Sequence, residues 1–178
     1  TAFPFAAALA QDAPQLQVFV PAAPGGGWDQ TARVMEQVLG REFDRAKRYG
    51  TELAVVFLDV DRFKEVNDRH GHDTGDEVLK WVGSRLVAMS RQSDVVARFA
   101  GDEFVVVLPN TGADRAYRLV DRLQTFFLST HLAWEGKVIP VSLSCGVATA
   151  AEAGVTDAVA LLKKADERLY HSKNSKKE

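Results

Sequence analysis

The hydrophobic pattern from residue 29 onward alternates between helical stripes and short apolar runs. Apolar residues that recur every three or four positions indicate amphipathic helices, and Leu53–Val60 is a near-continuous apolar run typical of a central strand. Thr74–Glu77 has the spacing of a capping box and predicts the start of a helix that reaches Met89. Together the pattern predicts helices at about 29–49, 74–89, 116–127 and 156–172, and strands at 53–60, 95–99, 103–108 and 138–148.

Tight turns join several of the predicted strands. A glycine turn separates 95–99 from 103–108, and Trp134–Lys137 has the composition of a hairpin turn. Hairpins require antiparallel pairing, so we expect an α+β fold with a mainly antiparallel central sheet flanked by helices. A length of 178 residues suits one globular domain with an appendage, which we assign to residues 31–178 and 1–30.

The N-terminal segment differs from the rest in composition. Phe3–Ala10 is similar to the end of a signal-peptide apolar region, with an unstructured tail as the alternative. Residues 15–39, with Gly25–Gly27 in a proline-rich loop, resemble the start of the periplasmic receptors of tripartite tricarboxylate transporters. In those receptors the loop and the following helix bind carboxylates, which implies either a carboxylate site or a fusion remnant here.

Composition limits the partners of the chain. A formal net charge of -2 gives no general attraction to nucleic acid, so a polyanionic ligand needs a local group of cations. Cys145 is the only cysteine, which rules out an intramolecular disulfide framework and a cysteine-based zinc site. No apolar run reaches the roughly 18 residues that cross a bilayer, so we expect no membrane-spanning segment in the chain.

Acidic residues end two of the predicted strands. Asp59 and Asp61 stand two apart and project from one face if the strand continues, where they can share a divalent cation such as Mg²⁺. The alternatives are a surface pair of acids and a calcium loop, and Phe63 and Lys64 exclude the loop by standing where an oxygen ligand and glycine belong. Asp102 and Glu103 lie at a hairpin tip between apolar strands, a position that calls for a cation or a function.

Two stretches, Phe57–Asp76 and Arg98–Phe104, together resemble the catalytic domain of diguanylate cyclases, the GGDEF family. The resemblance covers about residues 41–177. It implies a ferredoxin-like palm of the nucleotidyl cyclase type, and an activity that condenses two GTP molecules into cyclic di-GMP with release of pyrophosphate. It also implies a homodimer, each subunit presenting one GTP, and a cytoplasmic location, which conflicts with the signal-like start.

By position, the resemblance assigns the metal ligands to Asp59, the Val60 carbonyl and Asp102, with Mg²⁺, or Mn²⁺ in its place, as the cofactor. Asp102 also matches the proposed proton acceptor and Glu103 the neighbouring signature acid. Ala100 replaces the first glycine of the signature, a small departure. The catalytic residues implied are Asp102, Glu103 and Lys64.

The resemblance further implies a set of substrate contacts. Asn67 and Asp76 match guanine readers, because a carboxylate accepts from both N1–H and the exocyclic amine of guanine. Lys177 stands where the family usually has arginine, which keeps the charge and loses the bidentate fork. The implied substrate-binding residues are Phe63, Lys64, Asn67, Asp76, Gly101, Lys173 and Lys177.

Arg91 and Asp94 match the Arg-x-x-Asp site through which the product inhibits family members, with an exposed ion pair as the alternative. His70 and His72 could serve as zinc ligands, but we interpret them as loop residues. The sequence therefore favours a product-inhibited diguanylate cyclase over two alternatives, a catalytically impaired module that senses GTP or cyclic di-GMP and a carboxylate-binding fragment.

Overall fold

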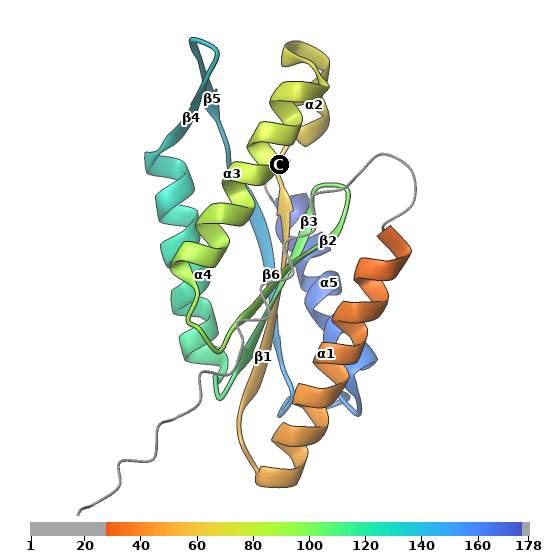
Figure 1. The fold of residues 1–178 in the computed structure, drawn as a ribbon. Helices are drawn as coiled ribbons and strands as arrows, with labels where there is room; N and C mark the ends of the chain where they lie inside the picture. The colour runs from red at the N-terminus through yellow and green to blue at the C-terminus, as the bar shows by residue number, and fades with distance from the viewer. Residues whose placement is uncertain (1–27, 176–178) are drawn as a thin grey trace, which may run out of the picture.

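The computed structural model describes residues 28–175, and Figure 1 shows their arrangement. The signal-like segment, the glycine loop and Lys177 lie outside the described residues. The elements in chain order are α1 (Trp28–Tyr49), β1 (Leu53–Val60), α2 (Phe63–His70), α3 (His72–Met89), β2 (Val95–Ala100), β3 (Glu103–Pro109), α4 (Ala113–Ser129), β4 (His131–Trp134), β5 (Lys137–Pro140), β6 (Leu143–Thr149) and α5 (Ala158–Ser175).

A four-stranded sheet in the order β2-β3-β1-β6 forms the centre of the domain. All of its pairings are antiparallel, and Asp59 at the end of β1 lies opposite Glu103 of β3 on one side and Ser144 of β6 on the other. The strands β4 and β5 form a separate hairpin. The predicted α+β class and antiparallel sheet are confirmed.

Helices cover both faces of the sheet (Figure 1). One core contains side chains of α3 and α4, such as Leu86 and Phe127, packed with Phe104 of β3. The other contains side chains of α1 and α5, such as Phe43 and Leu161. Because β1 contributes to both cores, every one of its residues is buried, which explains its near-continuous apolar sequence.

The capping-box prediction is wrong. The helix α3 begins at His72, and Thr74 lies inside it with its hydroxyl donating to the His70 carbonyl at 3.0 Å. Gly71, at φ 88°, separates α2 from α3 in a conformation that favours glycine. Asp76 is therefore in the second turn of the helix and not in the first.

Two further details differ from the predicted pattern. The region 63–70 forms α2, a helix that the pattern missed, because none of its described side chains is fully buried and no apolar stripe marks it. The strand expected over 138–148 is divided by Val141 and Ser142, so that β5 pairs with β4 and β6 joins the central sheet. Among the described residues no helix is long and apolar enough to cross a membrane.

Candidate active site

The turn between β2 and β3 brings Asp102 to the end of β1. The Val60 amide donates to the Asp102 carbonyl at 3.2 Å, and Arg98 Nε donates to the Gly101 carbonyl at 2.7 Å. Gly101 adopts φ 42°, a left-handed conformation that favours glycine at this turn. These contacts hold Asp102 beside the last residues of β1.

Asp59 is a buried acid with a cation against it. Its side chain is 5% exposed, and Lys173 Nζ of α5 lies 2.5 Å from its Oδ2 atom. Burial raises the pKa of Asp59, Lys173 acts in the opposite direction, and the neighbouring Asp102 adds to the rise. Lys173 pairs with Asp59, and Asp102 adds a second acidic side chain beside the pair.

Glu103 adds a third carboxylate to this edge of the sheet. Burial raises its pKa, and the charges of Asp59, Asp102 and Asp166 raise it further. Glu103 does not line the cavity next to Asp59. Its position opposite Asp59 in the antiparallel register places its charge beside the metal-ligand candidates.

Asp59, Asp102 and the Val60 carbonyl fit a divalent ion of the Mg²⁺ type. Among the side chains that the structure describes, no three of histidine, cysteine or acidic type form a group able to hold a metal by themselves. Mg²⁺ is usually bound through one or two carboxylates and completed by water and substrate phosphates, so two acids and one carbonyl suffice. No such group forms around His70 and His72, and His72 stands at the first position of α3 rather than in a loop.

Asp61 has a different environment from Asp59. The strand β1 ends at Val60, and the Asp61 carboxylate accepts hydrogen bonds from the hydroxyls of Ser142 at 2.7 Å and Ser144 at 2.5 Å. The condition for a shared cation, a strand that continues through Asp61, is therefore not met. The hydroxyl groups of Ser142, which precedes β6, and Ser144 of β6 satisfy its carboxylate oxygens instead.

A cavity of about 990 Å³ opens beside the acidic edge. It lies between α2, the end of α4, the β4–β5 hairpin and the segment Val141–Ser142 that precedes β6. Its lining includes six of the predicted site residues, namely Asp59, Val60, Phe63, Lys64, Asp102 and Lys173. The fold therefore brings the predicted metal ligands and two predicted phosphate cations to one hollow.

The predicted guanine readers lie beside this cavity, not in its lining. Asn67 is on α2 and Asp76 on α3, two helices that pack together. The Asn67 Oδ1 atom is buried and has no hydrogen-bond partner among the described residues. A buried acceptor without a partner is unfavourable, and a ligand with an N–H group would satisfy it.

Gly75 makes room for the Asn67 side chain. A Cβ atom at position 75 would overlap the Asn67 amide oxygen and lie 3.2 Å from Phe63 Cζ. We expect Gly75→Ala to leave the melting temperature nearly unchanged, because the displaced amide is the end of a flexible side chain and alanine favours helix. If Asn67 reads guanine, as the resemblance implies, displacing its amide should weaken GTP binding about tenfold, the effect of roughly one hydrogen bond to the base. Isothermal titration with GTP and ATP tests this, and unchanged preference for GTP would contradict it.

Close packing of α5 on β6 places Lys173. A Cβ atom at Gly146 would overlap the Ala165 carbonyl oxygen and the Leu169 amide nitrogen, so only glycine lets the two backbones approach this closely. Arg168 donates to the Val147 carbonyl and forms an ion pair with Glu152. Sequence reasoning missed this role, although a glycine inside an apolar strand is a usable signal of close backbone approach.

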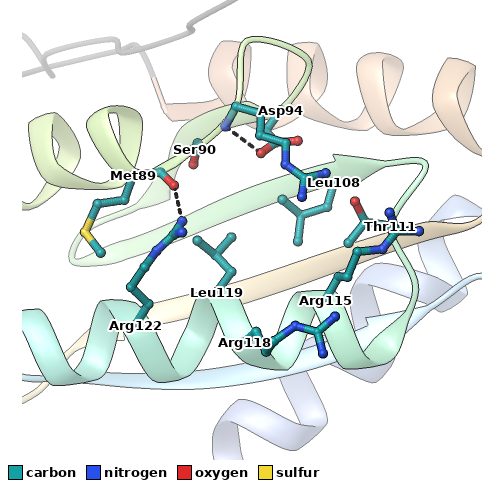
Figure 2. A pocket seen from close by; sticks show the side chains of 10 residues that line it. Met89, Ser90, Asp94, Leu108, Thr111, Arg115, Arg118, Leu119 and Arg122 are labelled. Atoms are coloured by element: carbon teal, nitrogen blue, oxygen red, sulfur yellow. Dashed lines mark hydrogen bonds between the residues drawn. The ribbon is translucent and has the colours of Figure 1, made fainter.

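A second pocket of about 390 Å³ contains the predicted inhibitory residues (Figure 2). Asp94 is buried, and its carboxylate accepts from the Arg91 amide at 2.7 Å, which closes the turn between α3 and β2. Three arginines of α4, which sequence reasoning missed, also line the pocket: Arg115, Arg118 and Arg122. Their spacing along one helix face is the signal that could have revealed them.

A family model and the sequence relatives of this chain indicate the same protein family. The model of the family described as diguanylate cyclase, GGDEF domain, matches residues 31–178. Diguanylate cyclase DosC of Escherichia coli is 40% identical over 142 residues, which are 79% of this chain and 30% of that protein. The response regulator PleD of Caulobacter vibrioides is 37% identical over 145 residues, 80% of this chain and 32% of that protein.

Solved structures agree with the sequence relatives. The GGDEF domain of YfiN from Pseudomonas aeruginosa superposes with a TM-score of 0.77 at 36% identity, covering 80% of this chain and 89% of that chain. The GGDEF domain of DgcB from Caulobacter crescentus, solved in complex with cyclic di-GMP, gives 0.76 at 26% identity, covering 81% and 82%. The chain belongs to the GGDEF family of diguanylate cyclase domains. It spans about a third of DosC and PleD, and the resemblance of residues 15–39 to transporter receptors stays a prediction.

Proposed function

We propose that this chain condenses two GTP molecules into cyclic di-GMP and releases pyrophosphate. The observation that carries the proposal is the convergence of Asp59, Asp102, Lys64 and Lys173 on one cavity. Two acids, a backbone carbonyl and two cations suit a nucleoside triphosphate with its metal, because phosphoryl transfer depends mainly on positioning and charge stabilisation.

The metal ligands in this proposal are Asp59, the Val60 carbonyl and Asp102. These residues would hold Mg²⁺, or Mn²⁺ in its place, which would supply a lower pKa for a 3′-hydroxyl and neutralisation of charge on the α-phosphate and the leaving pyrophosphate. Asp102 accepts the proton of the 3′-hydroxyl. Lys64, Lys173 and Lys177 hold the phosphates, and Gly101 lets the turn approach them without a side chain.

In this proposal Glu103 contributes negative charge next to the metal site. Its charge adds to that of Asp59 and Asp102, which strengthens the attraction for a divalent cation at the metal site. Phe63 packs beside the Gly75 position and so borders the guanine site. Asn67 and Asp76 read the edge of the base, which favours GTP over ATP. The reaction takes place in a homodimer, since each subunit presents one GTP to the other.

Product formation tests the proposed function directly. The purified chain is incubated with GTP and Mg²⁺, with Mn²⁺ in a parallel sample, and cyclic di-GMP and pyrophosphate are quantified by chromatography and mass spectrometry. We expect one cyclic di-GMP for every two pyrophosphates and no product from ATP. A folded dimer that binds GTP without forming product would contradict the proposal.

A second candidate function is a catalytically impaired module that senses GTP or cyclic di-GMP. One relative that matches 81% of this chain, at 38% identity, is named cyclic di-GMP phosphodiesterase NbdA, of which the matched region is 18%. The pocket with Arg91 and Asp94 is the observation that favours a binding role. Tight binding of cyclic di-GMP without GTP turnover would support this candidate.

Product inhibition is expected to act through the arginine-lined pocket. Arginine side chains grip phosphate and stack on guanine, so Arg91→Ala should remove charge-assisted hydrogen bonds and raise the half-inhibitory concentration of cyclic di-GMP about tenfold or more. The initial rate without added product should stay the same. Arg85→Ala is the matched control, since Arg85 is an exposed α3 residue stacked on Phe126 outside the pocket. Equal inhibition of the Arg91→Ala variant and the wild type would refute the assignment.

A further inference from the structure

Asp61 is bound through its backbone and its side chain to Ser142, which precedes β6, and through its side chain to Ser144 of β6. Its amide donates to the Ser142 carbonyl at 2.9 Å, and its carboxylate accepts from the hydroxyls of Ser142 and Ser144 at 2.7 and 2.5 Å. Ser144 is fully buried. Asp61 is thus held at a fixed position one residue after β1 ends.

The residue that follows is in a conformation that needs support. Arg62 adopts φ 57° and ψ 28°, a left-handed conformation that a non-glycine residue keeps only when its surroundings enforce it. Its carbonyl accepts from the amides of Glu65 at 2.9 Å and Val66 at 3.3 Å, and so begins α2. The hydrogen bonds of Asp61 fix the chain on one side of this turn, and the first turn of α2 fixes the other.

The turn determines where the phosphate end of the site lies. Phe63 and Lys64 are the first two residues of α2, and both line the cavity that contains Asp59 and Lys173. The side chain of Arg62, the N-cap residue, makes no capping hydrogen bond. We propose that Asp61 is a positioning residue, which uses Ser142 and Ser144 to hold the left-handed turn and thereby sets Lys64 against the phosphates of the nucleotide. This inference rests on the proposed function, because it takes a nucleoside triphosphate as the ligand.

A comparison of two variants separates positioning from metal binding. Asp61→Asn and Asp61→Ala both remove the charge, but only asparagine keeps hydrogen bonds to the two serines, because a hydroxyl both donates and accepts. A role that depends on the carboxylate charge, such as binding a metal, would be impaired in both variants. A positioning role that depends on the hydrogen bonds would be kept in the asparagine variant and lost in the alanine variant.

The experiment measures equilibrium binding of GTP and of guanosine to the full chain in buffer that contains a chelator and no divalent metal. We expect Asp61→Ala to bind GTP about tenfold more weakly than Asp61→Asn, the effect of roughly one charge-assisted hydrogen bond. Guanosine, which lacks phosphates, should bind both variants equally. The Ser142→Ala/Ser144→Ala double variant, which retains the Asp61 charge, should lose GTP affinity relative to the wild type by a similar factor.

Several results would overturn the inference. Equal GTP affinity of the two Asp61 variants would show that the hydrogen bonds do not position the phosphate site, and an equal loss for guanosine would show a general disturbance. If Asp61→Ala does not fold, the serine double variant and Asp61→Asn still decide the question by the same comparison of GTP with guanosine. Wild-type protein that binds GTP without making cyclic di-GMP would contradict the proposed function alone.

Discussion

Asp102→Ala is expected to abolish cyclic di-GMP formation, with a fall in rate of roughly 10³-fold or more, the scale seen when a central catalytic group is removed. In the proposed mechanism the change takes away a metal ligand and the proton acceptor together. The fold should persist, because the turn is held by backbone contacts, namely the bond from the Val60 amide to the Asp102 carbonyl and that from Arg98 to the Gly101 carbonyl. The initial rate of product formation and the far-UV circular dichroism spectrum measure the two effects.

Two comparisons complete this test. Asp102→Asn keeps the size of the side chain and removes its charge, so its rate should also fall by orders of magnitude. Asp44→Ala, which removes an exposed acid of α1, should keep the wild-type rate. If Asp102→Ala retains activity, the assignment of the metal site is wrong.

Gly146→Ala is expected to destabilise the domain by about 3 kcal/mol, near the upper part of the usual range for overpacking. The added methyl group would meet backbone atoms of Ala165 and Leu169, which cannot turn away as a side chain can. The helix α5 must then move away from β6, and Lys173 moves with it. We expect a lower unfolding midpoint in urea and a lower rate of product formation.

Gly40→Ala is the matched control for this variant. Position 40 lies in α1, and a Cβ atom there meets nothing within 4 Å. Alanine in place of glycine inside a helix should stabilise the domain by about 0.5–1 kcal/mol. Equal stability of Gly146→Ala and the wild type would show that α5 adapts without cost, and that Gly146 does not set the position of Lys173.

The central part of the fold follows from the sequence because its periodicity is strong. The apolar run Leu53–Val60 predicts a doubly covered strand, and the structure buries all of it. The sequence pattern does not predict helix α2, because its stability comes from the turn at Arg62 and from packing on α3. Neither of these leaves an apolar stripe in the sequence. The sequence predicts that α3 starts at Thr74, but the helix starts at His72. Thr74 lies inside it and donates to the carbonyl four residues earlier, as serine and threonine do inside helices.

The residues of the candidate site are likewise partly predictable from the sequence and partly visible only in the structure. Motif spacing predicted the acids and lysines that line the cavity, because Asp59, Lys64 and Asp102 stand at recognisable positions along the chain. It did not predict the partners that place them. The serines that bind Asp61 and the arginines of α4 come from segments remote from Asp61 and Arg91, and only the folded chain shows that they meet. Gly75 is closer to Asn67 along the chain, but its contact with that side chain also depends on the packing of α2 against α3.

Diffraction from crystals grown with Mn²⁺ and a GTP analogue that cannot be turned over would locate the metal and the nucleotide together, because manganese is located by its anomalous signal. We expect manganese between the carboxylates of Asp59 and Asp102 at the Val60 carbonyl, phosphates beside Lys64 and Lys173, and the base beside Asn67 and Asp76. Manganese bound to other residues, or a nucleotide outside the cavity next to Asp59, would contradict this expectation.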